Sequence, residues 1–387
     1  MDVSLFISGR VRFRRRIVTV SIAISFFVMI IAVAISAGFR HEIRSGLADI
    51  TGDIQIVPPD MNVMDEDSPI ERYPAYLNKV LALDGVKTVV PVIYKAGVVK
   101  CGDDIYGVLF KGVERSDSTA LSVSIPSGFA ARTSLEPGDD MLAYFIGNKL
   151  KMRRFNVASV HDVIVETDAN IVIQADIQDL QRLSGWEEGD VSSLEILLDD
   201  DLRNETDMHE MTMRIGTLVN AYSDESEAPV IAVSSLNRYP QIFDWLDLID
   251  FNVVFILILM TIVAGFNMIS GLLIMLFENI SLIGILKAMG MTDKNIAKVF
   301  LSSSAVLVGK GMLAGNVFAL LLCFIQMHVH AIPLNPANYF VSYVPVSVDM
   351  GLILLADAAA FVVIMLLLLI PCMFITKVDP AETVKMQ

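Results

Sequence analysis

The chain has 387 residues, 54% of them apolar, and its mean hydropathy of +0.59 lies well above that of an ordinary soluble domain. It is also acidic, with 29 Lys and Arg against 44 Asp and Glu and a formal net charge of −15. This charge disfavours nucleic-acid binding, and the 3 cysteines lack the paired spacing of a disulfide framework or a structural zinc site. A chain that is both apolar and acidic is expected to be divided between lipid and water.

The apolar residues gather in separate segments. Residues 17–38 hold no charged side chain, and about 22 residues suffice to cross a hydrocarbon core of about 30 Å. This run is longer than the apolar region of a cleaved signal peptide. Further spans are expected at 251–277, 299–327 and 350–374. The sequence therefore predicts an α-helical membrane protein with four transmembrane helices and a large α+β extracytoplasmic domain between the first and second.

Basic residues near the predicted spans indicate the orientation. They are Arg10, Arg12, Arg14, Arg15 and Arg16, then Lys287, Lys294 and Lys298, then Lys377 and Lys385. By the positive-inside rule both termini and the loop between the second and third spans are cytoplasmic. The connecting segments are a cytoplasmic arm at 1–16, a cytoplasmic loop at 278–298, a periplasmic loop at 328–349 and a cytoplasmic tail at 375–387. Residues 39–250 are then exported, and they carry 37 Asp and Glu against 18 Lys and Arg.

The exported segment shows alternating and helical periodicity, which predicts a two-lobed α+β domain over 51–239 that divides near 116–136. Strands are expected at 53–57, 87–94, 96–100, 105–113, 141–146, 155–160, 169–174 and 193–198. Helices are expected at 70–83, 177–183 and 205–217.

Helical spacing also continues beyond the spans. The first membrane helix is expected to extend as a stalk to about residue 50, where Gly52 ends it, and an interfacial helix is expected at 240–250. Two such stalks would give a route for force between the bilayer and the exported domain. The alternative is that both are amphipathic linkers.

Catalytic motifs are not apparent in the sequence. The run Gly309, Lys310 and Gly311 lies in an apolar span and lacks the spacing of a phosphate-binding loop, and no Ser/His/Asp or HExxH pattern occurs. The chain is therefore expected to have no enzyme activity of its own and to bind no metal or cofactor.

A short apolar helix is expected at 280–290 in the cytoplasmic loop, ended by Gly290, with Thr292 as the N-cap of the next helix. An apolar helix in such a loop either fits a hydrophobic groove on a partner or lies flat in the membrane interface. The candidate contact residues are Glu278, Ile280, Leu282, Ile283, Gly284, Ile285, Leu286, Lys287, Met289 and Gly290.

Polar residues occur inside the predicted spans, where they are costly unless they are paired or face an interior. They are Lys310, Asp357, Asn267 and Asn316. A loose pair of Lys310 with Asp357 between the third and fourth spans is one expectation. The alternative is that each reaches water separately.

The loop also carries a family resemblance. Residues 267–270, Glu278 and residues 283–290 are similar to the coupling-helix signature of FtsX-like, MacB-type ABC transporter permeases. The layout of one span, a large exported domain and three spans most closely resembles that of the lipoprotein-releasing, LolC/LolE-like permeases. Stretches at 4–10, 52–56, 335–346 and 379–381 support the resemblance. The chain departs from it after the coupling Glu, where relatives commonly have Arg and Thr and this chain has Asn279 and Ile280.

The resemblance implies a permease subunit of the bacterial inner membrane that pairs with a second copy or a paralogue. A separate ATPase subunit would hold ATP and Mg²⁺ and dock on the coupling helix. Its closure would reach the periplasmic domain through the stalks and release lipoprotein cargo to a periplasmic carrier. The alternatives are a MacB-like mechanotransmission component of an efflux system and an FtsX-like scaffold that regulates cell-wall hydrolases.

Overall fold

The computed structural model describes residues 15–59, 69–102, 104–114, 120–146, 150–163, 171–224, 227–335 and 339–373. Most of the predicted arm, the whole predicted tail and the stretches at 4–10 and 379–381 lie outside these residues. The described chain divides into two compact units. The membrane unit comprises the described residues of 15–40, 245–333 and 344–373, and the sheet unit those of 41–244 and 334–343.

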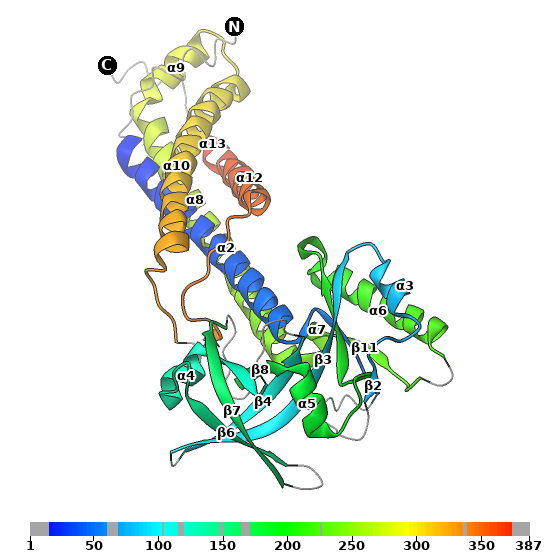
Figure 1. Ribbon diagram of the computed structural model, residues 1–387. Helices are drawn as coiled ribbons and strands as arrows, with labels where there is room; N and C mark the ends of the chain where they lie inside the picture. Colours follow the sequence, from blue (N-terminus) through cyan, green and yellow to red (C-terminus); the bar gives the residue numbers. More distant parts are fainter. Residues whose placement is uncertain are drawn as a thin grey trace. The chain divides into compact units, whose positions relative to one another are not determined.

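Four helical segments, counted over the described residues, are long and apolar enough to cross a membrane. They are α2 (Arg15–Thr51), α8 (Pro240–Glu278), α10 (Asp293–Val329), and α12 (Met350–Leu367) together with α13 (Leu369–Cys372). The short α9 (Ile280–Ala288) joins α8 to α10 (Figure 1). Apolar helices thus occur at each of the positions where the sequence predicts a span.

The membrane unit has its own core, to which all of these long helices contribute. Its fully buried members include Ile22, Phe26, Met268, Leu272, Phe300 and Ile364. Close packing of α2 on α10 depends on Gly311 and Gly315, because a Cβ atom at Gly315 would lie 2.5 Å from the Ala23 carbonyl oxygen. Small residues spaced by four let two membrane helices approach closely.

The sheet unit is built on a nine-stranded sheet in the order β11-β1-β10-β3-β4-β8-β5-β7-β6. Its strands are β1 (Ile54–Val57), β3 (Val86–Cys101), β4 (Asp104–Val113), β5 (Ser122–Pro126), β6 (Asp140–Ile146), β7 (Leu150–His161), β8 (Ile171–Asp176), β10 (Ser193–Leu198) and β11 (Ile231–Ser234). A small separate pair joins β2 (Ile70–Glu71) to β9 (Asp190–Val191). Most pairings are antiparallel, and β4–β8 and β5–β7 are parallel.

Strand β3 pairs with β6 as well as with β4, so that β3, β4, β8, β5, β7 and β6 form a closed ring. Inside the ring Phe110, Phe145 and Phe155 are fully buried, with ring centroids 4.9 Å apart for Phe110 and Phe145 and 5.2 Å apart for Phe110 and Phe155. Aromatic rings at such distances add to the stability that burial alone gives.

Short helices cover this framework. They are α3 (Leu77–Leu81), α4 (Ser127–Thr133), α5 (Ile177–Ser184), α6 (Glu205–Tyr222) and α7 (Ser235–Arg238), with a 3₁₀ turn η1 (Asp200–Leu202). Helix α6 packs on β11 beside α3, α5 packs on β3, β4 and β8, and α4 packs on β5 and β7 (Figure 1).

Several sequence predictions for this unit are corrected. The two strands expected at 87–94 and 96–100 are the single strand β3, since no turn interrupts them. The helix expected at 70–83 is reduced to β2 and α3. The lobe boundary expected near 116–136 is wrong, because β5 lies in this segment and pairs with β7 and β8 inside the ring.

Candidate functional site

Helix α9 leaves α8 at Asn279, whose φ of −111° and ψ of 19° interrupt the helix. The Asn279 side chain donates from Nδ2 to the Met275 carbonyl oxygen at 2.8 Å, and so satisfies a carbonyl at the end of α8. The Ile283 amide then donates to the Asn279 carbonyl oxygen at 3.0 Å and begins α9. Asn279 therefore makes a local contact with α8 through its short amide.

The end of α9 is a Schellman motif. Gly290 has φ +91°, its amide donates to the Lys287 carbonyl oxygen at 2.9 Å, and the Met291 amide donates to the Leu286 carbonyl oxygen at 3.0 Å. Thr292 occupies the N-cap position of α10 as expected, but its side chain makes no capping hydrogen bond. The turn from α9 into α10 is thus determined by the backbone at Gly290.

Helix α9 has an inner and an outer side. Ile283 is 1% exposed within the core of the membrane unit, whereas Ile285 is 47% and Met289 78% exposed. The outer side, here called the docking face, consists of Ser281, Ile285, Ala288 and Met289. Of the predicted contact residues, Ile283 and Gly284 are buried, Ile280, Leu282, Leu286 and Lys287 are half-buried, and Glu278, Ile285, Met289 and Gly290 are exposed. Only part of the predicted set is therefore accessible to another protein.

Lys287 connects α9 to the start of α10. Its Nζ lies 3.0 Å from Asp293 Oδ1, and its side chain is only 11% exposed. Asp293 is the first residue of α10, where a carboxylate also interacts favourably with the helix dipole. This ion pair links α9 to α10, so a displacement of α9 is expected to reach α10.

The polar residues of the predicted spans are not arranged as expected. The Asp357 carboxylate, which is buried on α12, accepts a hydrogen bond from Asn316 Nδ2 on α10 at 2.5 Å. Lys310 is exposed, and Asn267 is half-buried. The expected Lys310–Asp357 pair is therefore corrected to an Asn316–Asp357 pair. The physical reason is that the short amide reaches the carboxylate across the α10–α12 contact without bringing a second charge into the apolar core.

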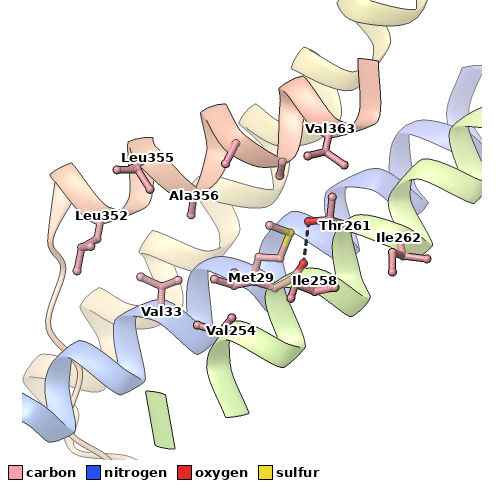
Figure 2. Close-up of a pocket in the computed structure, with 13 residues that line it drawn as sticks. Met29, Val33, Val254, Ile258, Thr261, Ile262, Leu352, Leu355, Ala356 and Val363 are labelled. Atoms are coloured by element: carbon pink, nitrogen blue, oxygen red, sulfur yellow. Dashed lines mark hydrogen bonds between the residues drawn. The ribbon is translucent and has the colours of Figure 1, made fainter. Parts of the chain in front are cut away.

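An apolar pocket of about 520 Å³ opens between α2, α8 and α12 (Figure 2). Its lining residues are Met29, Val33, Val254, Leu257, Ile258, Thr261, Ile262, Leu352, Leu355, Ala356, Ala359, Ala360 and Val363. Thr261 is the one polar residue among the lining residues that the structure describes, and its hydroxyl donates to the Leu257 carbonyl oxygen at 2.7 Å within α8. The pocket therefore offers a surface suited to hydrocarbon.

The sequence predictions do not include this pocket. Its walls come from three helices that are far apart in the chain, and every wall is as apolar as a lipid-facing surface. The one local signal is the spacing of Ala356, Ala359 and Ala360, which places small side chains on one face of α12. Small residues on a membrane helix indicate either close helix packing or a hollow.

The match to a known family covers this same part of the chain. Residues 254–380 match the FtsX-like permease C-terminal family. This part of the chain is similar to an FtsX-like permease domain. It includes most of α8, all of α9 with the docking face, α10 and α12. The family resemblance predicted from the coupling motif is confirmed.

A curated relative also matches part of the chain. The lipoprotein-releasing system transmembrane protein LolC of Neisseria meningitidis serogroup B is 31% identical over 140 residues, 34% of this chain and 33% of that protein. The match thus spans about a third of the length of this curated relative.

Solved structures are similar at lower identity. The periplasmic region of MacB from Actinobacillus actinomycetemcomitans is 13% identical over 49% of this chain and 91% of its own, with a TM-score of 0.30. The extracellular domain of the noncanonic ABC-type transporter YknZ from Gram-positive bacteria is 14% identical over 46% of this chain and 98% of its own, with a TM-score of 0.28.

Proposed function

We propose that this chain is the permease subunit of an ABC transporter in a bacterial inner membrane and that a separate ATPase subunit binds the docking face of α9. The observation that carries this proposal is the exposure of Ile285 and Met289 on a short helix inside an FtsX-like permease domain. Exposed apolar side chains on one helix face fit a hydrophobic groove on another protein. ATP and Mg²⁺ belong to that partner.

The lengths of α2 and α8 support transmission of movement to the periplasmic side. Each is an uninterrupted helix, of 37 and 39 residues respectively. Helices of this size are about 55 to 58 Å long, whereas the hydrocarbon core is about 30 Å thick. Both helices therefore extend well beyond the bilayer, and each ends or begins within the residues of the sheet unit. A movement started at α9 by ATPase closure would travel along them.

The cargo we propose is a lipid-anchored protein, released from the outer leaflet to a periplasmic carrier by a dimer of permease subunits. The LolC similarity and the apolar pocket support this cargo. An acyl chain that leaves the bilayer for water loses about 0.8 kcal/mol for each methylene group exposed, and the pocket would spare the anchor this cost. We therefore expect the pocket to hold part of the lipid anchor.

Depletion of the protein followed by membrane fractionation tests this function. Outer-membrane lipoproteins stranded in the inner membrane are the expected result. Normal lipoprotein sorting combined with drug sensitivity would contradict lipoprotein release and support an efflux component. Normal sorting combined with a defect in cell-wall hydrolysis would support the scaffold alternative.

Pocket filling gives a second test of the cargo. Ala359→Phe places a ring inside the pocket and is expected to reduce crosslinking of the lipid anchor while ATP hydrolysis continues. Leu354→Phe is the matched control, because Leu354 is exposed on α12 and does not line the pocket. Equal crosslinking in both variants would show that the anchor binds elsewhere.

A further inference from the structure

A buried ammonium group lies at the end of α2. Lys111 on β4 is 5% exposed, and its Nζ donates to the carbonyl oxygens of Asp49 at 3.1 Å and Ile50 at 2.7 Å. These are among the last carbonyls of α2, which have no partner within the helix. A cation at a helix C-terminus is also favoured by the helix dipole. Lys111 therefore acts as a cap on a helix that begins in the membrane unit.

The same ammonium is held by a carboxylate. Glu195 on β10 is 4% exposed, and its Oε2 lies 2.8 Å from Lys111 Nζ. Tyr94 lies on β3, the strand between β10 and β4. Its hydroxyl is hydrogen-bonded to Glu195 Oε1 and lies 3.0 Å from the Ile50 carbonyl oxygen. Gln55 Nε2 donates to the Tyr94 hydroxyl at 3.3 Å. Side chains from four neighbouring strands thus meet on the end of one helix.

The sheet register explains why these side chains meet. Lys111 is paired with Tyr94 across β4 and β3, and Gln55 is paired with Glu195 across β1 and β10. Directly opposed residues point to the same face of a sheet. The position of the cluster is therefore determined by the strand pairing, and α2 is attached to a rigid surface.

The backbone closes the same joint. Gly52 has φ +71°, and its amide donates to the Ala48 carbonyl oxygen at 2.8 Å, which is the αL form of helix ending. The chain then enters β1, and the amide of Asp53, which directly precedes this strand, donates to the Ile196 carbonyl oxygen at 3.0 Å. Beside β1 lies β11, which leads through α7 to the start of α8. The end of α2 and the approach to α8 are thus anchored on adjacent strands.

We propose that Lys111, Glu195 and Tyr94 are positioning residues that form a fixed joint, through which movement of α2 is transmitted to the sheet. A buried ion pair is a costly way to stabilise a fold, because apolar side chains of similar volume are often as good. Here the pair also supplies donors for two helix carbonyls, which apolar residues cannot do. The functional part of this inference depends on the proposed transporter activity, whereas the joint itself does not.

Hydrogen exchange on the full-length protein in lipid nanodiscs tests the joint directly. Lys111→Met is expected to accelerate exchange over residues 48–54 at least about tenfold, because two carbonyls and a carboxylate lose their donor. Tyr94→Phe, which removes only one hydroxyl, is expected to act in the same direction and more weakly.

The matched control is Lys95→Met. Lys95 is a buried lysine on β3 that donates to Ser184 Oγ at 3.2 Å, and by strand alternation it faces the opposite side of the sheet from Tyr94. Its loss should leave exchange over 48–54 unchanged. Equal acceleration in Lys111→Met and Lys95→Met would overturn the joint, because it would show a general loosening of the domain.

The functional readout is the number of lipoproteins released per ATP hydrolysed by the reconstituted complex. Lys111→Met should lower this ratio at least about fivefold, the lower end of typical coupling between sites, and Lys111→Arg, which keeps a cation, should restore most of it. Accelerated exchange with an unchanged ratio would overturn the positioning role. Absence of release by the wild-type complex would contradict the proposed function, while the exchange data would still decide on the joint.

Discussion

The ends of α2 and α9 share a local feature that the protein uses in two ways. Gly52 follows α2 with φ +71°, and Gly290 follows α9 with φ +91°. A Cβ atom at Gly52 would lie 3.0 Å from Glu195 Cβ, whereas one at Gly290 would meet nothing within 4 Å among the residues that the structure describes. A glycine in this conformation therefore marks where a helix stops. Whether that end is enclosed or accessible depends on the surrounding fold.

Lys111→Met is expected to have the largest effect, because it destabilises the enclosed end of α2. It leaves the Glu195 carboxylate buried without its cation, a change that typically costs about 3–5 kcal/mol. The measurement is the apparent Tm of the full-length protein. The control is the double variant Lys111→Met, Glu195→Leu, which removes both charges and should recover part of the loss. A double variant less stable than the single one would contradict this account.

Ile283→Asp and Ile285→Asp compare the two sides of α9. A carboxylate at Ile283 enters the core and should cost about 3 kcal/mol, whereas one at Ile285 should change stability by less than about 0.5 kcal/mol. Apparent Tm and ATPase co-purification check the pair. Ile285→Asp should lose the ATPase while remaining folded, and the control Asn295→Asp adds the same charge at an exposed site nearby. Retention of the ATPase by folded Ile285→Asp would place docking elsewhere.

Gly52→Ala and Gly290→Ala compare the helix ends directly. Each forces alanine into a left-handed conformation, which costs about 1–2 kcal/mol. Gly52→Ala should be the worse of the two, because its Cβ also presses on Glu195. Apparent Tm measures the difference. Equal losses would mean that the surroundings of Gly52 yield easily and that the joint is not rigid.

Local sequence periodicity predicts many of the strands and helices of this structure, but it does not predict which of their side chains meet other parts of the chain. Strand β4 and helix α5 are predicted from alternation and from helical spacing, since each buries one side against a local neighbour. Lys111 appears in that alternation as an ordinary polar residue of a strand, because its partners at the end of α2 lie about 60 positions earlier in the chain. Along α9 nearly every residue is apolar, so no periodicity separates the buried Ile283 from the exposed Ile285.

A smaller effect is expected inside the membrane unit, where Asn316 and Asp357 make the α10–α12 hydrogen bond. Asn316→Leu and Asp357→Leu should be coupled by about 1 kcal/mol in a double-mutant cycle. Lys310→Met serves as the control and should show no coupling to Asp357→Leu. Coupling to Lys310 in place of Asn316 would restore the ion pair expected from the sequence.

The smallest predicted effect is a pH dependence at the enclosed end of α2. Burial raises the pKa of the Glu195 carboxyl above its ordinary value of 4.5, although the Lys111 ammonium acts in the opposite direction. A carboxyl whose pKa is higher in the folded state contributes stability that is complete below 4.5 and is lost as the pH rises through the folded value. The apparent Tm of the wild type should therefore fall more steeply than that of Glu195→Gln as the pH rises from 4.5 towards neutrality. Parallel curves would show that the Lys111 cation compensates fully for the burial of Glu195. The ion pair would then hold the joint without any difference in the pKa of Glu195 between the folded and unfolded states. The end of α2 would differ from the exposed end of α9 in its packing alone.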